Sequence, residues 1–333
     1  MNAAAATTVA AGPRPTPHRM GMLFEILDEM GEDPTFTFEL TRLGGGAPIA
    51  AVDIKHAESD GYGGLTRFLR QQGISFEAPA QRTATAPPSL LSRMSSLYRV
   101  VRHRPASSLV LRASGAAWTA GARVTARPHA GRLLSAEASA RVFASARAVG
   151  ASVSSYLLHA LTETVVPAIA EPSASVTWGV PVNMRGPVRV VPDEANCSSI
   201  MPVDVPRGGS AFAVHQALAA ALAADLHWGK WDQLNTAARF GRRALKNKIS
   251  RYYRTAGAAR IGVFSNVGVW KGDTAPDVGV IGFGVPMLPD PIFATMVTWN
   301  GKLGLSLRAH PSLTADPAVV ARWMDAWLDR IAP

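Results

Sequence analysis

Residues 55–61 read Lys-His-Ala-Glu-Ser-Asp-Gly, and they place an imidazole four positions before a carboxylate. The preceding residues 50–54 have the composition of a β-strand, whereas the glycine-rich residues 61–64 disfavour a helix. We therefore expect His56 to lie in a loop between a strand and a helix that begins at Gly64. Catalytic side chains are often carried on such loops, so His56 is a candidate general base.

Two other interpretations of the spacing between His56 and Asp60 remain open. The two residues could form an ordinary surface pair, or they could be the first two ligands of a metal site at helical i, i+4 spacing. No third histidine, cysteine or carboxylate follows at the spacing of a metal ligand, so no metal ligand is assigned.

Five later stretches add landmarks in a fixed order along the chain. Residues 144–153 lead into an apolar helix through Ala170, with Ser152 as its expected N-cap. The other four stretches are Val-Pro-Val-Asn-Met-Arg at 180–185, Glu-Ala-Asn-Cys-Ser-Ser-Ile-Met-Pro at 194–202, Phe-Ser-Asn-Val-Gly at 264–268, and residues 297–307, which have the pattern of a terminal hairpin.

Together with residues 55–61, these stretches resemble the signature motifs of the chloramphenicol acetyltransferase-like superfamily. That superfamily includes peptide-synthetase condensation domains, polyketide-associated acyltransferases and wax-ester synthases. The resemblance spans roughly residues 45–333. It departs from the HHxxxDG motif at Lys55, which replaces the first histidine, and at Ala195, which replaces the usual glycine before Asn196.

The resemblance implies an α/β fold, a two-lobed chloramphenicol acetyltransferase-like sandwich. The His motif lies closer to the start of this sequence than is typical of the family, so we expect a truncated first lobe. The expected organisation is a flexible lead-in at 1–19, a first lobe with the HxxxDG loop at 20–129, and a second lobe at 130–333. A helix is expected at 20–30, strands at 36–40 and 50–54, and a strand pair at 109–125.

The resemblance also implies roles for individual side chains. His56 would accept the proton of a hydroxyl or amine that attacks a thioester, while Asp60 would pair with Arg185 and hold the loop in shape. The oxyanion donors would come from Ser198, Ser199 and Asn266. We accordingly assign as catalytic His56, Asp60, Arg185, Ser199 and Asn266, and as substrate-binding Lys55, Gly61, Tyr62, Asn183, Asn196, Ser198 and Ser265. Lys55 is equally compatible with a solvent-facing lysine at a strand end.

Composition excludes several classes of protein. The chain has 333 residues, 47% of them hydrophobic, which is enough to bury a substantial core, and it contains no run of 18 apolar residues that would predict a membrane span. The first residues lack the features of a signal peptide, so we expect a cytoplasmic location. Cys197 is the only cysteine, which excludes an internal disulfide. A small buried residue is the simpler interpretation of Cys197, and a catalytic thiol is the alternative.

The charge of +10 is unevenly distributed. Residues 234–271 contain no acidic residue and nine lysines and arginines, and on a single helix Arg239, Arg243 and Lys246 would lie near one another. This segment could be a solvated helix face, or it could contact an acidic carrier protein, coenzyme A phosphates or a membrane surface. Nucleic acid is not expected, because no recognised binding motif accompanies the charge.

The leading functional hypothesis is a condensation-type acyltransferase, in secondary metabolism or lipid modification. It would move an acyl group from the thioester of an acyl carrier protein or coenzyme A to a small-molecule alcohol or amine. Coenzyme A or phosphopantetheine would be a co-substrate, and no permanently bound cofactor is expected. Two alternatives remain: a cyclisation, elimination or isomerisation on the same fold, and a non-catalytic module that docks a carrier protein through residues 239–260.

Overall fold

The computed structural model describes residues 19–79, 87–103, 123–170, 172–186, 188, 194–255 and 260–332. The elements before residue 134 are α1 (Arg19–Glu29), β1 (Thr35–Arg42), β2 (Ala50–Lys55), α2 (Gly61–Gln71), β3 (Phe76–Glu77), α3 (Leu90–Arg102) and β4 (His129–Leu133). The helices that follow are α4 (Ala136–Ala148), α5 (Val153–Ile169), α6 (Ala211–Ala223), α7 (Leu226–Arg239), α8 (Arg242–Thr255) and α9 (Pro317–Ile331). The strands that follow are β5 (Ser175–Asn183), β6 (Ser198–Pro206), β7 (Gly262–Gly272), β8 (Val278–Phe283), β9 (Ile292–Trp299) and β10 (Lys302–Ala309).

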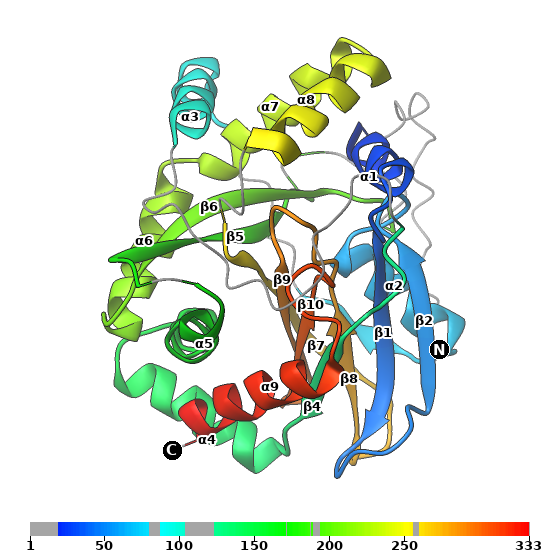
Figure 1. Cartoon of the computed structure of the whole chain (residues 1–333). Coiled ribbons are helices and arrows are strands. Elements are labelled where there is room, and N and C mark those ends of the chain that lie inside the picture. Colours follow the sequence, from blue (N-terminus) through cyan, green and yellow to red (C-terminus); the bar gives the residue numbers. More distant parts are fainter. Residues whose placement is uncertain are drawn as a thin grey trace, which may run out of the picture.

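These strands form two sheets (Figure 1). The smaller sheet has the order β2-β1-β8, and β1 is antiparallel to both of its neighbours. The larger sheet has the order β4-β10-β9-β7-β5-β6, with β3 also paired to β7. Strand β7 runs parallel to both β5 and β9, so the larger sheet is mixed. The expected α/β class is confirmed.

Both sheets draw on segments far apart in the sequence. Strand β1 near the N-terminus is completed by β8, with Phe38 opposite Gly282. The expected lobe boundary at 129/130 falls inside β4, which pairs with β10. Residues on both sides of that boundary therefore build the smaller sheet, which carries the His56 loop at the end of β2.

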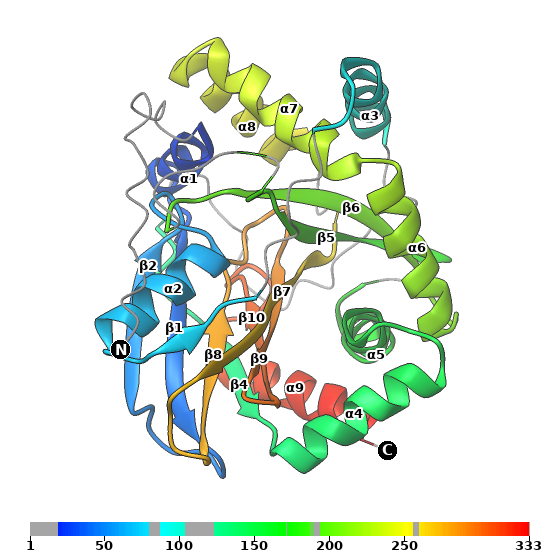
Figure 2. The same ribbon diagram turned by 180° about the vertical axis from the view of Figure 1, so that it is seen from behind.

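The helices form two groups. Helices α4, α6 and α9 each contact both α5 and the larger sheet, and Figure 2 shows the four helices on one side of it. Helices α1, α3, α7 and α8 form a second group, in which α7 packs on β6 and contacts the other three helices. In the part of the chain that the structure describes, no helix is long and apolar enough to cross a membrane.

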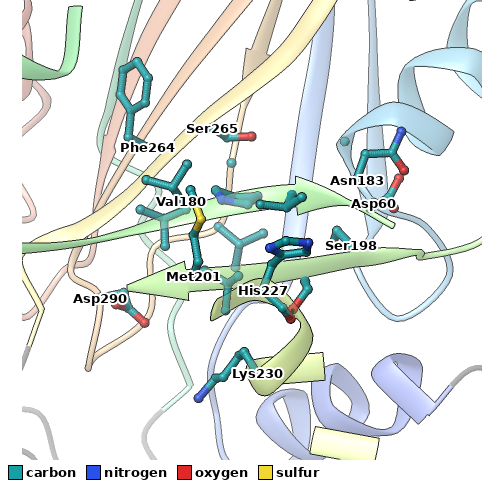
Figure 3. A pocket seen from close by; sticks show the side chains of 18 of the residues that line it. Asp60, Val180, Asn183, Ser198, Met201, His227, Lys230, Phe264, Ser265 and Asp290 are labelled. Atoms are coloured by element: carbon teal, nitrogen blue, oxygen red, sulfur yellow. Dashed lines mark hydrogen bonds between the residues drawn. The ribbon is translucent and has the colours of Figure 1, made fainter. Parts of the chain in front are cut away.

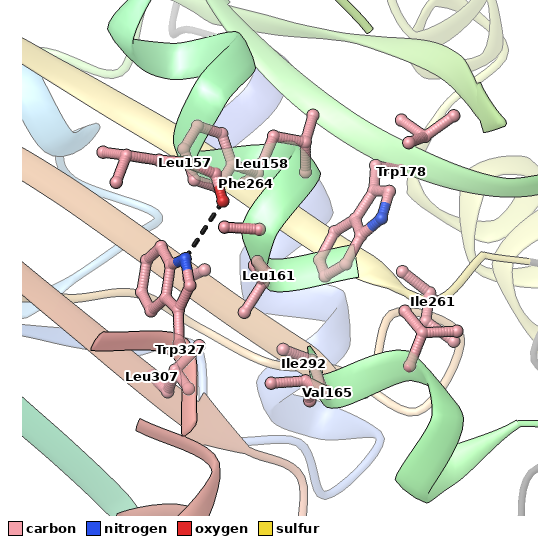
Figure 4. Close-up of a cluster of buried hydrophobic side chains, with 14 of the residues drawn as sticks. Leu157, Leu158, Leu161, Val165, Trp178, Ile261, Phe264, Ile292, Leu307 and Trp327 are labelled. Carbon is pink, nitrogen blue, oxygen red and sulfur yellow. Dashed lines mark hydrogen bonds between the residues drawn. The ribbon is translucent and has the colours of Figure 1, made fainter. Parts of the chain in front are cut away.

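The main hydrophobic core lies between the first helix group and the larger sheet (Figure 4). The buried tryptophans of this core have hydrogen-bond partners for their indole N–H groups. Trp327 Nε1 donates to the carbonyl oxygen of Leu157 at 3.0 Å, and Trp178 Nε1 donates to Thr162 Oγ1 at 3.0 Å. A buried indole N–H needs such a partner, so these contacts fix α5 against α9 and β5.

The predicted N-cap of α5 is confirmed, since Ser152 Oγ accepts from the backbone N–H of Ser155 at 3.1 Å. The expectation that α2 begins at Gly64 is wrong, because α2 begins at Gly61. Asp60 Oδ1 accepts from the backbone N–H of Gly63 at 2.9 Å and caps this start, and a side chain at position 63 would collide with the carbonyl of Glu194. The glycines therefore reflect close packing rather than a loop.

Two other expectations concern less regular segments. The basic residues after 238 do not share one helix, because α7 ends at Arg239 and α8 begins at Arg242 after Gly241, whose φ is 88°. Most of the expected strand pair at 109–125 lies outside the described residues, and 123–125 has no regular structure.

Candidate active site

A cavity of about 1060 Å³ lies between the smaller sheet, β5, β6 and the helices α7 and α8. Its walls include His56, Asp60 and Tyr62 from the His loop and the start of α2. Figure 3 shows Asp60 and Asn183 on one side of the cavity and Asp290 on the other, with Val180 and Met201 between them. A cavity of this size can hold a small-molecule substrate.

Aromatic rings fix the plane of the His56 side chain. The ring stacks on Phe24 of α1 with a centroid distance of 3.9 Å and an interplanar angle of 16°. Phe36 of β1 contacts the His56 ring in an edge-to-face arrangement, with a centroid distance of 5.4 Å and an interplanar angle of 73°. Three elements, α1, β1 and β2, therefore place the imidazole at the cavity wall, where it is half-buried.

Hydrogen bonds determine which nitrogen of His56 carries the proton. Nδ1 lies 2.8 Å from the carbonyl oxygen of Ser59, which can only accept, so Nδ1 bears the hydrogen. Asn196 Nδ2 lies 3.0 Å from Nδ1 and 2.8 Å from the His56 carbonyl oxygen, and it donates to that carbonyl. The lone pair therefore lies on Nε2, which has no hydrogen bond among the described residues.

The surroundings of His56 also favour its neutral form. Burial lowers the pKa of His56 below its usual 6.5, since desolvation disfavours the imidazolium. The Ser59 carbonyl and the Asp60 charge oppose this shift only in part. A neutral imidazole with a lone pair on Nε2 can accept a proton near pH 7.

The loop is held to the rest of the protein by a buried ion pair. Asp60 Oδ2 accepts from Arg185 Nη1 and from the backbone N–H of Cys197, each at 2.7 Å. Arg185 also donates to the Ala195 carbonyl, and its guanidinium lies 4.9 Å from the centre of the Tyr62 ring. The pair therefore joins the start of α2 to the segments that follow β5 and precede β6.

Asn183 and Asn196 form hydrogen bonds that support Arg185 and the His56 loop. Asn183 Oδ1 accepts from the backbone N–H of Arg185 at 3.0 Å. Asn196 is 1% exposed, and its Oδ1 accepts from Ser198 Oγ at 3.2 Å while its Nδ2 holds the His56 carbonyl. Asn183 and Ser198 line the cavity, whereas the contacts of Asn196 are to the protein itself.

Two of the expected oxyanion donors make hydrogen bonds within the protein. Ser199 Oγ donates to the backbone carbonyl of His227 at 2.7 Å, and this bond joins β6 to α7. Asn266 Nδ2 donates to Ser154 Oγ at 2.9 Å, and its Oδ1 accepts from the backbone N–H of Gly268 at 2.8 Å. Both residues line the same cavity as His56, but these bonds give them a structural role at this point. Gly61 and Ser265 also line the cavity.

Lys55 does not belong to this site, which corrects the expectation that it binds substrate there. Neighbouring residues of a strand point to opposite faces, so the end of β2 that turns His56 inward turns Lys55 outward. Its Nζ lies 3.4 Å from Asp28 Oδ2, and the side chain is 60% exposed. Lys55 lines a separate, smaller cavity beside Asp33 and Arg127.

Cys197 is buried in the protein interior. It is 0% exposed and packs in a cluster with Met20 and Phe24 of α1. Burial raises the pKa of the thiol to about 12, so it stays protonated at neutral pH and is not a nucleophile. The described residues contain no group of three or more metal-ligating side chains.

A second polar group in the cavity has no counterpart in any sequence motif. It consists of Lys230 of α7, Lys248 of α8, Arg260 and Asp290. These residues lie far apart in the sequence. The only sequence feature that points to this polar group is Lys230, because a lysine between Trp228 and Trp231 is unusual in a helix that packs against the core.

Comparisons with known proteins identify the fold. No family model matches the sequence, and no curated protein matches it. Among solved structures, the SgcC5 protein from Streptomyces globisporus is similar with a TM-score of 0.52 and 12% identity, over 94% of this chain and 88% of that one. The EpoB NRPS cyclization-docking bidomain from Sorangium cellulosum has a TM-score of 0.53 and 14% identity, over 84% of this chain and 59% of that one.

The first condensation domain of the CDA synthetase is similar as well, with a TM-score of 0.51 and 14% identity over 88% of this chain and 66% of that one. The chain therefore has the condensation-domain fold, of the chloramphenicol acetyltransferase-like type. At these identities the likeness defines the fold alone, so the reaction has to be argued from the site.

Proposed function

We propose that this protein is a condensation-type acyltransferase. It moves an acyl group from the thioester of an acyl carrier protein or of coenzyme A to a hydroxyl or an amine. One observation carries the proposal: the cavity wall presents a neutral His56 whose Nδ1–H is bonded to Ser59, so that Nε2 is left to accept a proton.

In the proposed reaction, the acceptor oxygen or nitrogen attacks the thioester carbonyl while His56 Nε2 takes its proton. General base catalysis of this kind is typically worth about 10²–10⁴ in rate. The tetrahedral intermediate then expels the thiolate, which takes the same proton back from Nε2. The acyl–sulfur bond breaks, the ester or amide bond forms, and the histidine returns to its neutral form.

Asp60 and Arg185 act as positioning residues in this scheme. Their ion pair lies behind the loop, and the nearby Asp60 charge stabilises the imidazolium while it holds the proton. Much of the remaining rate comes from holding donor and acceptor together in the cavity. The SgcC5 protein, which has this fold, was solved in complex with a naphthyl ethanediol, and that alcohol supports a hydroxyl acceptor.

Coenzyme A or phosphopantetheine would enter as part of the donor. The fold similarity to a condensation domain supports a carrier-bound thioester. A second candidate reaction is cyclisation on a carrier-bound intermediate, which the likeness to a cyclization-docking bidomain favours. The two reactions differ in their products, since only acyl transfer moves the whole acyl group to a separate acceptor.

Intact-mass spectrometry tests the proposal. Acyl-loaded carrier proteins are incubated with candidate alcohols and amines and with wild type, His56→Ala or His129→Ala. His129 is exposed on β4 and does not line the cavity, so His129→Ala is the matched control. We expect wild type and His129→Ala to convert the acyl group into an ester or amide, and His56→Ala to lose at least about 99% of this activity. Full activity in a folded His56→Ala protein would refute the role of the base.

A further inference from the structure

The cavity carries a charged end, which lies across from Asp60 and Asn183 (Figure 3). Arg260 Nη2 pairs with Asp290 Oδ2 at 2.6 Å, and these side chains are 14% and 1% exposed. Lys230 projects from α7 into the same region, and its Nζ donates to Gln233 Oε1 at 3.0 Å. Lys248 of α8 lines the cavity as an exposed residue.

The buried charges at this end do not balance. Asp290 neutralises Arg260, whereas neither Lys230 nor Lys248 forms an ion pair with any residue that the structure describes. Lys248 is the more exposed of the two lysines, so the more deeply buried uncompensated charge is that of Lys230. Burial lowers the pKa of Lys230 to about 7, and the positive charges of Arg260 and Lys248 add to this shift. One bound anion would remove the imbalance.

Hydrogen bonding at this end is incomplete as well. Asp290 Oδ1 and Arg260 Nε are buried and have no hydrogen-bond partner among the described residues. Both residues line the cavity. Buried polar groups are nearly always paired in folded proteins, so unpaired donors and acceptors on a cavity wall indicate a polar ligand.

The length of strand β5 gives the distance between this end of the cavity and the His56 loop. A side chain at Gly179 would lie 3.3 Å from Arg260 Nη1, and Asn183, four residues further along β5, contacts Arg185 beside the loop. Four residues at about 3.3 Å each span about 13 Å. Val180 of β5 and Met201 of β6 line the cavity between the two ends, so the path is largely apolar.

We propose that this end binds the carboxylate of a substrate whose apolar chain spans about 13 Å to the His56 loop. Lys230 supplies the counter-charge, and Arg260 Nε donates a further hydrogen bond. A carboxylate fits better than a phosphate, because Lys230, the more deeply buried lysine at this end, has no ion pair with any described residue and Asp290 would repel a dianion more strongly than a monoanion. The position of the reacting bond in this substrate rests on the proposed acyl transfer, whereas carboxylate binding does not.

Calorimetric titration with a matched pair of probes, one anionic and one neutral, tests this site. Decanoate and decanamide have the same chain, and only decanoate carries the charge. We expect wild type to bind decanoate at least about tenfold more tightly, since a charged hydrogen bond contributes roughly 1.5–3 kcal/mol. Equal affinity of wild type for the two probes would overturn the proposal without the need for any variant.

Variants then assign the preference to Lys230. Lys230→Met removes the charge, keeps an unbranched side chain that is shorter by one atom, and should abolish the preference for decanoate. Lys246→Met is the matched control, because Lys246 also lies in the basic region but pairs with Glu29 outside the cavity, and it should leave the preference unchanged. A preference that survives in Lys230→Met, or that is lost equally in Lys246→Met, would contradict the assignment.

Two further measurements distinguish a carboxylate site from a phosphate site, and this inference from the proposed function. Decyl phosphate that binds more than about tenfold more tightly than decanoate, and only when Lys230 is present, would identify a phosphate site and overturn the carboxylate. His56→Ala should retain the decanoate preference while losing acyl transfer. A protein that prefers decanoate but transfers no acyl group refutes the proposed function alone, and one that transfers acyl groups without the preference refutes this inference alone.

Discussion

Arg185 Nη1 lies 2.7 Å from Asp60 Oδ2, and the two side chains are only 3% and 4% exposed. Asp60 also caps α2 through Gly63 and accepts from the backbone N–H of Cys197. One carboxylate therefore connects the His loop, a helix start and the entry to β6. Such an arrangement fixes the position of His56 at the expense of two desolvated charges.

Replacing Asp60 by asparagine should strongly destabilise the protein. The change leaves Arg185 as an uncompensated buried charge, so we expect the free energy of unfolding to fall by about 3 kcal/mol in urea titrations. Glu58→Gln is the control, because Glu58 and Arg67 form an exposed pair at 2.9 Å that contributes less than about 1 kcal/mol. Equal losses in the two variants would contradict the structural role of Asp60.

Protonation of His56 should give the rate an acidic limb. Burial lowers the pKa of His56 below 6.5, so Nε2 is free at pH 7 and becomes protonated only below that value. A profile of kcat/KM against pH should therefore show its acidic limb below pH 6.5. In the same range the unfolded state binds a proton that the folded state does not, so stability contributed by neutral His56 is lost as the pH falls from 6.5 towards the lowered pKa. An acidic limb centred above pH 6.5 would exclude this histidine as the base.

Asn196 should affect turnover rather than substrate binding. Its amide holds the His56 carbonyl at 2.8 Å, so Asn196→Ala should displace the imidazole and lower kcat by roughly 10–100-fold, with little change in KM. Steady-state kinetics measure both constants. Asn247→Ala, on the exposed side of α8, should leave both unchanged. An Asn196→Ala enzyme with altered KM and unchanged kcat would argue for direct contact with substrate.

Cys197 should be unreactive in the native protein. The pKa of its thiol is raised to about 12 and the side chain is fully buried. A thiol reagent such as DTNB should therefore label the folded protein only as fast as it unfolds, and label it at once in concentrated urea. Rapid stoichiometric labelling of the native form would show that the burial is incomplete.

Affinity for decanoate should fall as the pH rises through about 7. The pKa of Lys230 is lowered to about 7, so the lysine loses its charge above that value, whereas a carboxylate is ionised throughout this range. The groups that face Lys230 are Gln233 of α7, Lys248 and Tyr252 of α8, Arg260 and Asp290. Titrations between pH 6 and 8.5 should show the decrease in wild type, and a flat profile in Lys230→Met.

The family resemblance implied the fold class, and local patterns were sufficient to predict the first strands and the His loop. The strand before His56, the cap at Ser152 and the hairpin between β9 and β10 depend on residues close in sequence. Asn300 and Gly301 form the hairpin turn with φ values of 48° and 76°, as an Asn-Gly pair favours. The start of α2 differs from the prediction, because the Asp60 cap and the close packing at Gly63 outweigh the low helix propensity of glycine.

Long-range relationships could not be predicted in the same way. Nothing local indicates that Arg260 and Asp290 meet Lys230 at one cavity end, since their proximity depends on the crossing of α7, β7 and the β8–β9 connection. The outward direction of Lys55 follows from strand alternation, but only once His56 is known to point inward. Arg242 likewise pairs with Glu25 and Glu29 of α1, which reduces the basic surface expected from the sequence.

The pairing of β1 with β8 has a consequence for the order in which the molecule is assembled. Strand β1 borders β2, which carries the His loop, yet its other edge stays open until residues 278–283 have been synthesised. A chain emerging from the ribosome therefore cannot complete this sheet early, and contacts of such long sequence separation form slowly. We expect the His56 loop to be among the last of these elements to reach its native position, because nascent chains that end before β8 cannot complete the sheet that carries it.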